Sequence, residues 1–235
     1  MNPFGRDGDV LHRLGVGPDD RAEAVTELRT SALGAPAERD VARGSILEVR
    51  ERGRVGVDIE IYEQIVQGKT GALFGFCGFG VGALSGDLTI AKRFEKAARA
   101  LGNAFQIADD VRDLVALEGD KDRLADLREK MPSFPQVFAA ASSKRVRAEL
   151  EKAWSAKKVS RATAEALKRS ILETDALETA ERTIAHSLAQ TRRVLAPFKA
   201  KKATQEILAW GQAMSDQLGA ELAAARIANE RRAKS

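Results

Sequence analysis

The sequence predicts an all-α protein built as a helical bundle. Apolar residues recur every three or four positions over most of the chain, no useful stretch alternates with period two, and proline is scarce, at 6 of 235 residues. Hydrophobic residues make up 44% and charged residues 31%, which excludes a disordered chain and supplies one sizeable core. We expect three parts: a lead-in with two helices (1–57), a central core (58–142) and C-terminal helices with a basic tail (143–235).

Turn-forming and helix-ending residues mark the first elements. Residues 1–17 carry clusters of Asn, Pro, Gly and Asp and are expected to be mostly irregular. Pro18 and the acids that follow it begin a helix that runs to Leu33. A second helix is expected to begin at Ala35 and to end at about Arg52, because two glycines follow.

A glycine-rich run follows the third predicted helix, which begins at Asp58 and leads to Lys69 and Thr70. Its glycines recur every three or four residues: Gly68, Gly71, Gly75, Gly78, Gly82 and Gly86. Each glycine inside a helix costs about 1 kcal/mol relative to alanine, so burial must hold such a helix together. A glycine stripe lets another backbone or a ligand approach closely. The alternative is a loop rich in glycine and aromatics, but the continuing period favours a helix.

Residues 88–117 form the most strongly periodic predicted helix. A charged loop with at most one short helical turn is expected over 119–135, followed by three or four amphipathic helices over 136–235. The uncharged run 70–86 lies at the short edge of what spans a bilayer, so we interpret it as a buried core helix and expect no integral membrane segment.

Charge and cysteine content exclude several function classes. A net charge of +4 is too thinly spread to demand a nucleic-acid partner, and the basic clusters at 199–202 and at the end are expected to be solvated helix ends. The single Cys77 excludes a disulfide framework and is expected to be a small buried hydrophobe. Acidic residues stand where a signal peptide would need an apolar run, so we expect a cytoplasmic protein.

Three acids on the long helix form the sharpest candidate for chemistry. Asp109 and Asp113 are four residues apart, so their Cβ atoms should lie about 5–6 Å apart on one face, with Asp110 beside them. On a solvated face such a cluster is harmless. Beside Phe105 in a cavity it would need counter-cations, and oxygen-only ligands select Mg²⁺.

Three segments in this order resemble the second half of a trans-isoprenyl diphosphate synthase. KTGALF resembles that family's lysine and threonine helix, GNAFQIADDVRD its second aspartate-rich motif, and DLREKMPSFP its downstream loop. The resemblance covers about residues 58–140. It implies the all-α isoprenoid synthase fold without its first helices. It also implies Mg²⁺-dependent ionisation of an allylic prenyl diphosphate, followed by attack of isopentenyl diphosphate on the carbocation.

The resemblance also assigns roles to individual residues. Asp109, Asp110 and Asp113 would hold Mg²⁺ on the diphosphate, which Lys69 and Lys130 would bind. The catalytic set would be Lys69, Thr70 and Gln106, whose dipoles could stabilise developing positive charge. The pocket for the prenyl tail would be lined by Phe74, Phe76, Phe79 and Phe105.

The chain departs from the family pattern at two places. The first aspartate-rich motif has no room before Lys69, and the nearest acids, beginning at Asp19, are interpreted as a helix start. In the downstream loop, Lys130 and Met131 occupy the place of the family's Gly-Lys pair.

Two hypotheses follow from these departures. In the first, the chain is a synthase subunit or truncated relative that is active only with a partner, either a synthase-like subunit in a hetero-oligomer or a second copy in a homodimer. In the second, it is a non-catalytic regulatory or prenyl-ligand-binding homologue that associates with a complete synthase. A binding module unrelated to isoprenoids is a third reading.

Overall fold

The computed structural model describes residues 34–115 and 124–233, and within these ranges every regular element is helical. The all-α prediction is therefore confirmed. The first group of elements comprises α3 (Gly34–Glu51), α4 (Ile59–Val66), the π-helical turn η1 (Gln67–Gly71), α5 (Ala72–Ala83) and α6 (Leu88–Val115). The second group comprises α7 (Ala125–Glu129), α8 (Phe134–Ser142), α9 (Lys144–Ser155), α10 (Arg161–Leu172), α11 (Ala176–Leu195), the 3₁₀ turn η2 (Ala196–Phe198) and α12 (Lys202–Ala233). The helix predicted to end at Leu33 lies outside the described residues.

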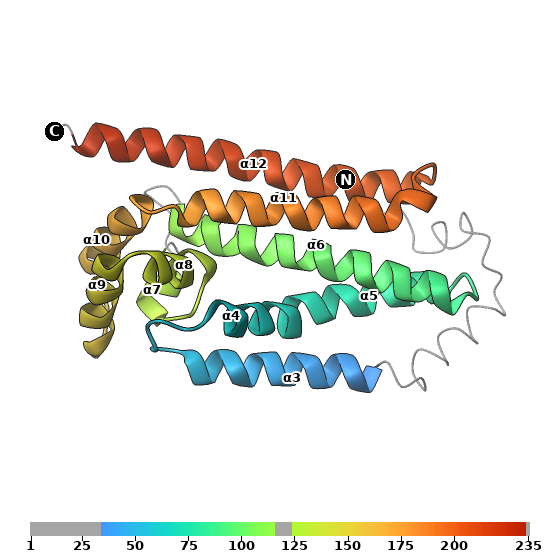
Figure 1. Ribbon diagram of the computed structural model, residues 1–235, viewed down its shortest axis with the longest axis horizontal. Helices are drawn as coiled ribbons and strands as arrows, with labels where there is room; N and C mark the ends of the chain where they lie inside the picture. The colour runs from blue at the N-terminus through green and yellow to red at the C-terminus, as the bar shows by residue number, and fades with distance from the viewer. Residues whose placement is uncertain (1–33, 116–123, 234–235) are drawn as a thin grey trace, which may run out of the picture.

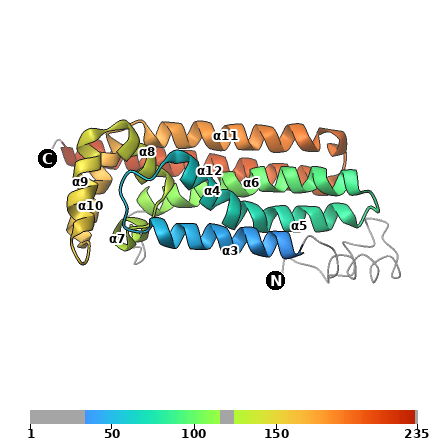
Figure 2. The ribbon, with the colours of Figure 1, turned by 60° about the horizontal axis from the view of Figure 1, so that its bottom comes forward.

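The long helices lie side by side along one axis, and the short helices close one end of the bundle. Figure 1 shows α12, α11, α6, the α4–α5 pair and α3 running lengthwise, while α9 and α10 run across them. The same crossing is visible after the rotation in Figure 2. The core extends from Val57 to Ala225, and α6 contributes many of its fully buried residues. Burial of the apolar faces of α5, α11 and α12 against α6 therefore holds the long helices together.

The predicted breaks fall where the structure turns. Helix α3 ends at Glu51, and Gly53 and Gly56 follow with positive φ of 79° and 76°, a region that favours glycine. The helix predicted from Asp58 runs through α4, η1 and α5 almost without interruption.

Helices α5 and α6 form a tight hairpin because glycines line their contact. A Cβ on Gly78 would lie 2.6 Å from the Phe94 carbonyl oxygen, and one on Gly82 would lie 2.5 Å from the Ala91 Cα. Gly78 and Gly82 of the glycine stripe therefore allow close approach between the α5 and α6 backbones, as the sequence predicts. The loop alternative for this run is wrong.

Two expectations need correction. From Phe134 to Ala233, the described part of the C-terminal region, the chain forms five α-helices rather than three or four, because α8 and α9 are separated by an extended Ser143 that caps α9. Cys77 is exposed rather than buried, because it lies on the face of α5 that borders an open apolar pocket. Among the described helices, none combines the length and the apolar character that a membrane crossing requires.

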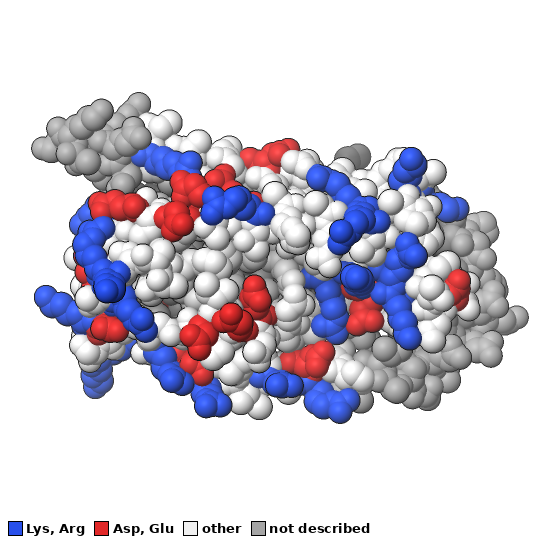
Figure 3. Space-filling view, viewed as in Figure 1, with Lys and Arg blue, Asp and Glu red and all other residues white. Residues whose placement is uncertain are grey.

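Charged side chains of both signs are spread over the face in Figure 3. Acidic side chains lie over the middle of the molecule, where α3 and α4 run, and basic side chains lie toward both ends. This face therefore carries both signs, in keeping with a net charge of only +4.

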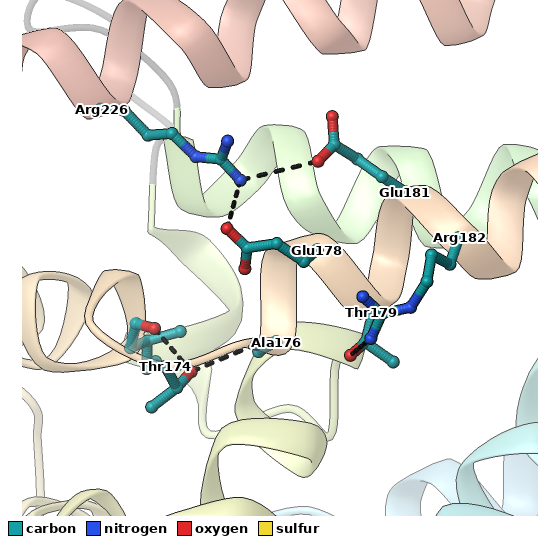
Figure 4. Close-up of polar contacts among 8 residues, drawn as sticks. Thr174, Ala176, Glu178, Thr179, Glu181, Arg182 and Arg226 are labelled. Atoms are coloured by element: carbon teal, nitrogen blue, oxygen red, sulfur yellow. Dashed lines mark hydrogen bonds and ion pairs between the residues drawn. The ribbon is translucent and has the colours of Figure 1, made fainter.

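Arg226 of α12 pairs with Glu178 and Glu181 of α11, at N–O distances of 2.6 and 3.6 Å (Figure 4). All three side chains are exposed, so water screens the pair. We expect Arg226→Gln to lower the free energy of unfolding by less than about 1 kcal/mol in urea denaturation. A larger loss would show that the stem of Arg226 packs between the helices.

Candidate functional site

A small polar pocket of about 60 Å³ lies where α3, α4, η1, α6 and the α7–α8 segment meet. Its polar lining comes from Glu48, Tyr62, Lys69, Thr70, Gln106, Asp110, Asp126 and Ser133. The structure thus brings Lys69 and Thr70 together with Gln106 and Asp110, which the sequence places on a different helix. The π-helical turn at η1 makes this possible because it widens one turn of the backbone beside α6, a device common at functional sites.

A chain of hydrogen bonds crosses the pocket from η1 to α8. The Thr70 hydroxyl donates to Gln106 Oε1 at 2.6 Å, and Gln106 Nε2 donates to Asp110 Oδ1 at 2.8 Å. Asp110 Oδ2 accepts from the Tyr62 hydroxyl at 2.7 Å and from the Phe134 amide at 2.8 Å. Both oxygens of Asp110 are therefore held, and the carboxylate is fixed in place.

Burial governs the protonation of the Asp110 carboxyl group. Burial raises the pKa of Asp110 to about 6, although hydrogen bonds from Gln106, Phe134 and Tyr62 pull the pKa in the opposite direction. The pKa of Tyr62 is raised well above its usual value, first by burial and then by the charge of Asp110. Tyr62 therefore remains a hydrogen-bond donor at any physiological pH.

The other two aspartates of the motif lie in different surroundings. Asp113 accepts hydrogen bonds from the amides of Ala125 at 2.8 Å and Asp126 at 3.0 Å, so it fixes the start of α7. Asp109 is exposed to solvent. The expectation that all three point into one hollow is therefore met by Asp110 alone among the described side chains.

Asp126 is a site residue that the sequence analysis placed only in a polar loop. It lines the pocket, and its pKa is raised to about 8 by burial and by the neighbouring charges of Asp110, Asp113, Asp109 and Glu48. So many carboxylates around one group make this corner a place where a bound cation would relieve repulsion. The segment DLREKMPSFP, which begins at Asp126, marks this loop in the sequence, but the burial of Asp126 could not be predicted because α7 reaches α6 only through the fold.

Lys69 is bound by a residue that the sequence analysis missed. Its ammonium donates to both oxygens of Glu48 on α3, at 2.8 and 2.7 Å. The side chain of Glu48 is 20% exposed and that of Lys69 is 37% exposed. Lys69 therefore faces the pocket already paired.

Lys130, expected to bind diphosphate, has other partners. Its ammonium donates to the carbonyls of Trp154 at 2.8 Å and Ala156 at 2.6 Å, so it satisfies the C-terminal end of α9. Its backbone has a positive φ of 60°, and it is not among the residues that line the polar pocket. In this conformation it stabilises the bundle end.

A second, apolar pocket of about 400 Å³ lies between α5, α6, α11 and α12. Of the four phenylalanines expected to line a tail pocket, Phe74 lines it, Phe76 is 39% exposed, and Phe79 is buried. Phe105 packs between Phe74 and Trp210, with ring centroids 5.6 and 6.1 Å away. The rest of the lining was missed because it comes from several helices, and its larger members are Leu73, Cys77, Val81, Phe94, Leu101, Leu195 and Ile207.

The acidic residues suit Mg²⁺ by the chemistry of their oxygens and by their negative charge. Carboxylate oxygens are the ligands that Mg²⁺ prefers, and Asp126 sits among repelling carboxylates. In the part of the chain that the structure describes, no three acidic, histidine or cysteine side chains converge on one point. The described side chains therefore form no ready-made metal site, and binding of Mg²⁺ by Asp109, Asp110 and Asp113 stays a prediction.

Comparison with known proteins decides the family. Residues 19–172 match the polyprenyl synthetase family, which is more than half of the chain. The chain belongs to the polyprenyl synthetase family. The chain is 32% identical over 105 residues to the all-trans-nonaprenyl-diphosphate synthase (geranyl-diphosphate specific) of Rhodobacter capsulatus. The aligned segment covers 43% of this chain and 31% of that protein. The chain is also 31% identical over 130 residues to the nonaprenyl diphosphate synthase of Mycobacterium tuberculosis, covering 51% of this chain and 39% of that one.

Solved structures confirm the fold of this family member. A polyprenyl synthase from Roseobacter denitrificans aligns with a TM-score of 0.73 at 23% identity, over 82% of this chain and 65% of that one. A polyprenyl synthase from Caulobacter crescentus, solved with calcium and isoprenyl diphosphate, aligns with a TM-score of 0.70 at 23% identity, over 83% of this chain and 60% of that one. The matches therefore span about a third of the curated relatives and under two thirds of these structures.

Proposed function

We propose that this chain contributes the second diphosphate site of a trans-polyprenyl diphosphate synthase, which condenses an allylic diphosphate with isopentenyl diphosphate. The observation that carries the proposal is the meeting of Lys69, Thr70, Gln106 and Asp110 in one polar pocket. A polar pocket for a charged head beside an apolar pocket for a tail suits a prenyl diphosphate. Thr70 of the polar pocket precedes Phe74 of the apolar pocket by four residues, about one helical turn.

The chain's own groups have distinct tasks in this proposal. Lys69 would bind oxygens of the diphosphate and offset the charge that grows as the leaving group departs. The oxygens of Thr70 and Gln106 would lie near the reacting carbons, where their dipoles stabilise positive charge. The apolar pocket would exclude water from the carbocation. Mg²⁺, when bound, would supply positive charge to the diphosphate.

A partner is part of the proposal. The first aspartate-rich motif would come from a synthase-like subunit or from a second copy of this chain. Such a partner would also cover exposed apolar residues, which on α5 include Leu73 at 54% and Val81 at 49% exposure.

A second candidate function, a non-catalytic homologue that tunes a complete synthase, is favoured by different contacts. Lys69 is already paired with Glu48, and Lys130 is used at the end of α9. These contacts leave fewer cations to hold a diphosphate, and removing one charge partner from such a site commonly costs about 3 kcal/mol or more in catalysis.

The deciding experiment incubates the purified chain with Mg²⁺, isopentenyl diphosphate and an allylic diphosphate, alone and with a synthase-like protein from the same source. We expect longer prenyl diphosphates only with the partner or with a self-associated form. Absence of product from every combination would contradict the enzymatic proposal and leave the regulatory one.

Asp109→Asn gives the matching binding test. Asp109 is exposed, so the substitution should leave the fold intact and weaken Mg²⁺-dependent binding of the allylic diphosphate about tenfold or more, as measured by calorimetry. Asp216→Asn on α12, an exposed residue outside both pockets, serves as the control and should bind like the wild type. Equal affinities for the two variants would argue that Asp109 holds no metal.

A further inference from the structure

The pairing of Glu48 with Lys69 is built into the contact between α3 and η1. A Cβ on Gly44 would lie 2.8 Å from the Lys69 amide nitrogen, and one on Gly68 would lie 3.0 Å from the Gly44 Cα. The two backbones therefore touch at this point. Glu48 follows Gly44 by one helical turn, and helical side chains lean toward the N-terminus, so its carboxylate extends over the place where Lys69 emerges.

The Glu48–Lys69 ion pair neutralises the positive charge that would otherwise bind an anion. Among the described residues that line the polar pocket, Lys69 is the one Lys or Arg, whereas Glu48, Asp110 and Asp126 are acidic. Both oxygens of Glu48 engage the ammonium, with Nζ–O distances of 2.8 and 2.7 Å. An incoming anion therefore meets a pocket in which the lysine is neutralised and the carboxyl groups offer it no positive charge.

We propose that Glu48 is an internal competitor for the diphosphate: its carboxylate holds Lys69 in place of the ligand and so sets the affinity of the pocket for anions. This inference rests on the proposed function of the same site. A diphosphate must break the Glu48–Lys69 contact to reach the ammonium, and Glu48 must then take another partner. Glu48 is a positioning residue, because it acts through Lys69.

The test uses inorganic pyrophosphate as the probe, with EDTA present so that the lysine alone is examined. Glu48→Gln removes the charge and nearly preserves the shape of the side chain. We expect it to bind pyrophosphate about tenfold more tightly than the wild type in calorimetry, because a charge-assisted contact no longer competes for Lys69. Glu38→Gln makes the same charge change at an exposed site about 15 Å away along α3 and should leave the affinity unchanged.

A double variant makes the test specific. If Glu48 acts through Lys69, the gain from Glu48→Gln disappears when Lys69→Met is also present. A gain that survives in the Lys69→Met background would overturn the proposal, as would a Glu48→Gln affinity equal to that of the wild type. Glu48→Ala, which removes the same carboxylate and has the highest helix propensity, keeps the test decisive if glutamine disturbs α3.

Failure of the proposed function would give different binding results from failure of the Glu48 proposal alone. A wild-type chain that binds neither pyrophosphate nor an allylic diphosphate in Mg²⁺ would refute the proposed function and this inference with it. A wild-type chain that binds both, together with an unchanged Glu48→Gln variant, would refute the role of Glu48 alone.

Discussion

Replacing Gly82 by alanine is expected to destabilise the protein by about 2 kcal/mol or more. The new Cβ would lie 2.5 Å from the Cα and 3.0 Å from the amide nitrogen of Ala91, and these backbone atoms belong to a residue with no exposed surface. Backbone cannot turn aside as a flexible side chain can, so α5 and α6 must separate. The loss should exceed the helix-propensity gain of about 1 kcal/mol that alanine brings.

Gly219→Ala is the matched control for Gly82→Ala. Gly219 also lies inside a helix, α12, but nothing stands within 4 Å of an added Cβ. The same substitution should therefore stabilise the protein by up to about 1 kcal/mol. Urea denaturation of both variants measures the difference. Gly82→Ala would contradict the close packing of the hairpin if it were as stable as Gly219→Ala.

Removal of the Asp110 carboxylate is expected to have the second large effect. Asp110→Ala leaves the buried Tyr62 hydroxyl and Phe134 amide without their acceptor and should cost on the order of 2–3 kcal/mol. Asp110→Asn keeps one oxygen for these donors, and its amide can donate to Gln106 if that side chain flips. The Thr70 hydroxyl then accepts rather than donates, so the hydrogen-bond chain survives in reverse.

The dependence of stability on pH distinguishes the effect of the Asp110 charge on stability from the effect of the shape of the side chain. In the folded protein the Asp110 carboxyl has a pKa of about 6, whereas in the unfolded chain its pKa is near 3.8. The folded state therefore binds more protons in this window, and the contribution of Asp110 to stability falls as pH rises from about 4 to about 6. A carboxyl pKa raised by about two pH units corresponds to about 3 kcal/mol.

Asp126, with a pKa of about 8, should extend the fall in stability to higher pH. In Asp110→Asn the first fall should vanish, and the second should shrink because Asp126 loses a charged neighbour. Denaturant unfolding at several pH values between 4 and 8 measures both. Identical pH profiles for the wild type and Asp110→Asn would mean that Asp110 ionises normally in the folded protein.

Much of the fold follows from local patterns. The period of apolar residues predicts the helices, and glycines predict both the end of α3 and the close contact of α5 with α6, because these features depend on residues near one another in the chain. The number of C-terminal helices was underestimated, since the break at Ser143 is a single extended residue with no proline or glycine to mark it.

The candidate site was predictable only in part. The motif residues could be named, yet the sequence could not show that Asp113 fixes α7 while Asp110 is buried, because four-residue spacing gives a shared face and not its surroundings. The partners of Lys69 and Lys130 also escaped prediction. Both lysines bind groups on distant elements, Glu48 of α3 and the end of α9.

The sequence by itself determined most of the helices, the glycine stripe and the residue types that can hold a cation and an anion. The tertiary structure alone decided which carboxylate meets the lysine, which aspartate loses its water, and which side chains enclose the apolar pocket between α5 and α12. The physical reason is that periodicity is a property of neighbouring residues, whereas desolvation and charge pairing depend on helices that the chain brings together from far apart.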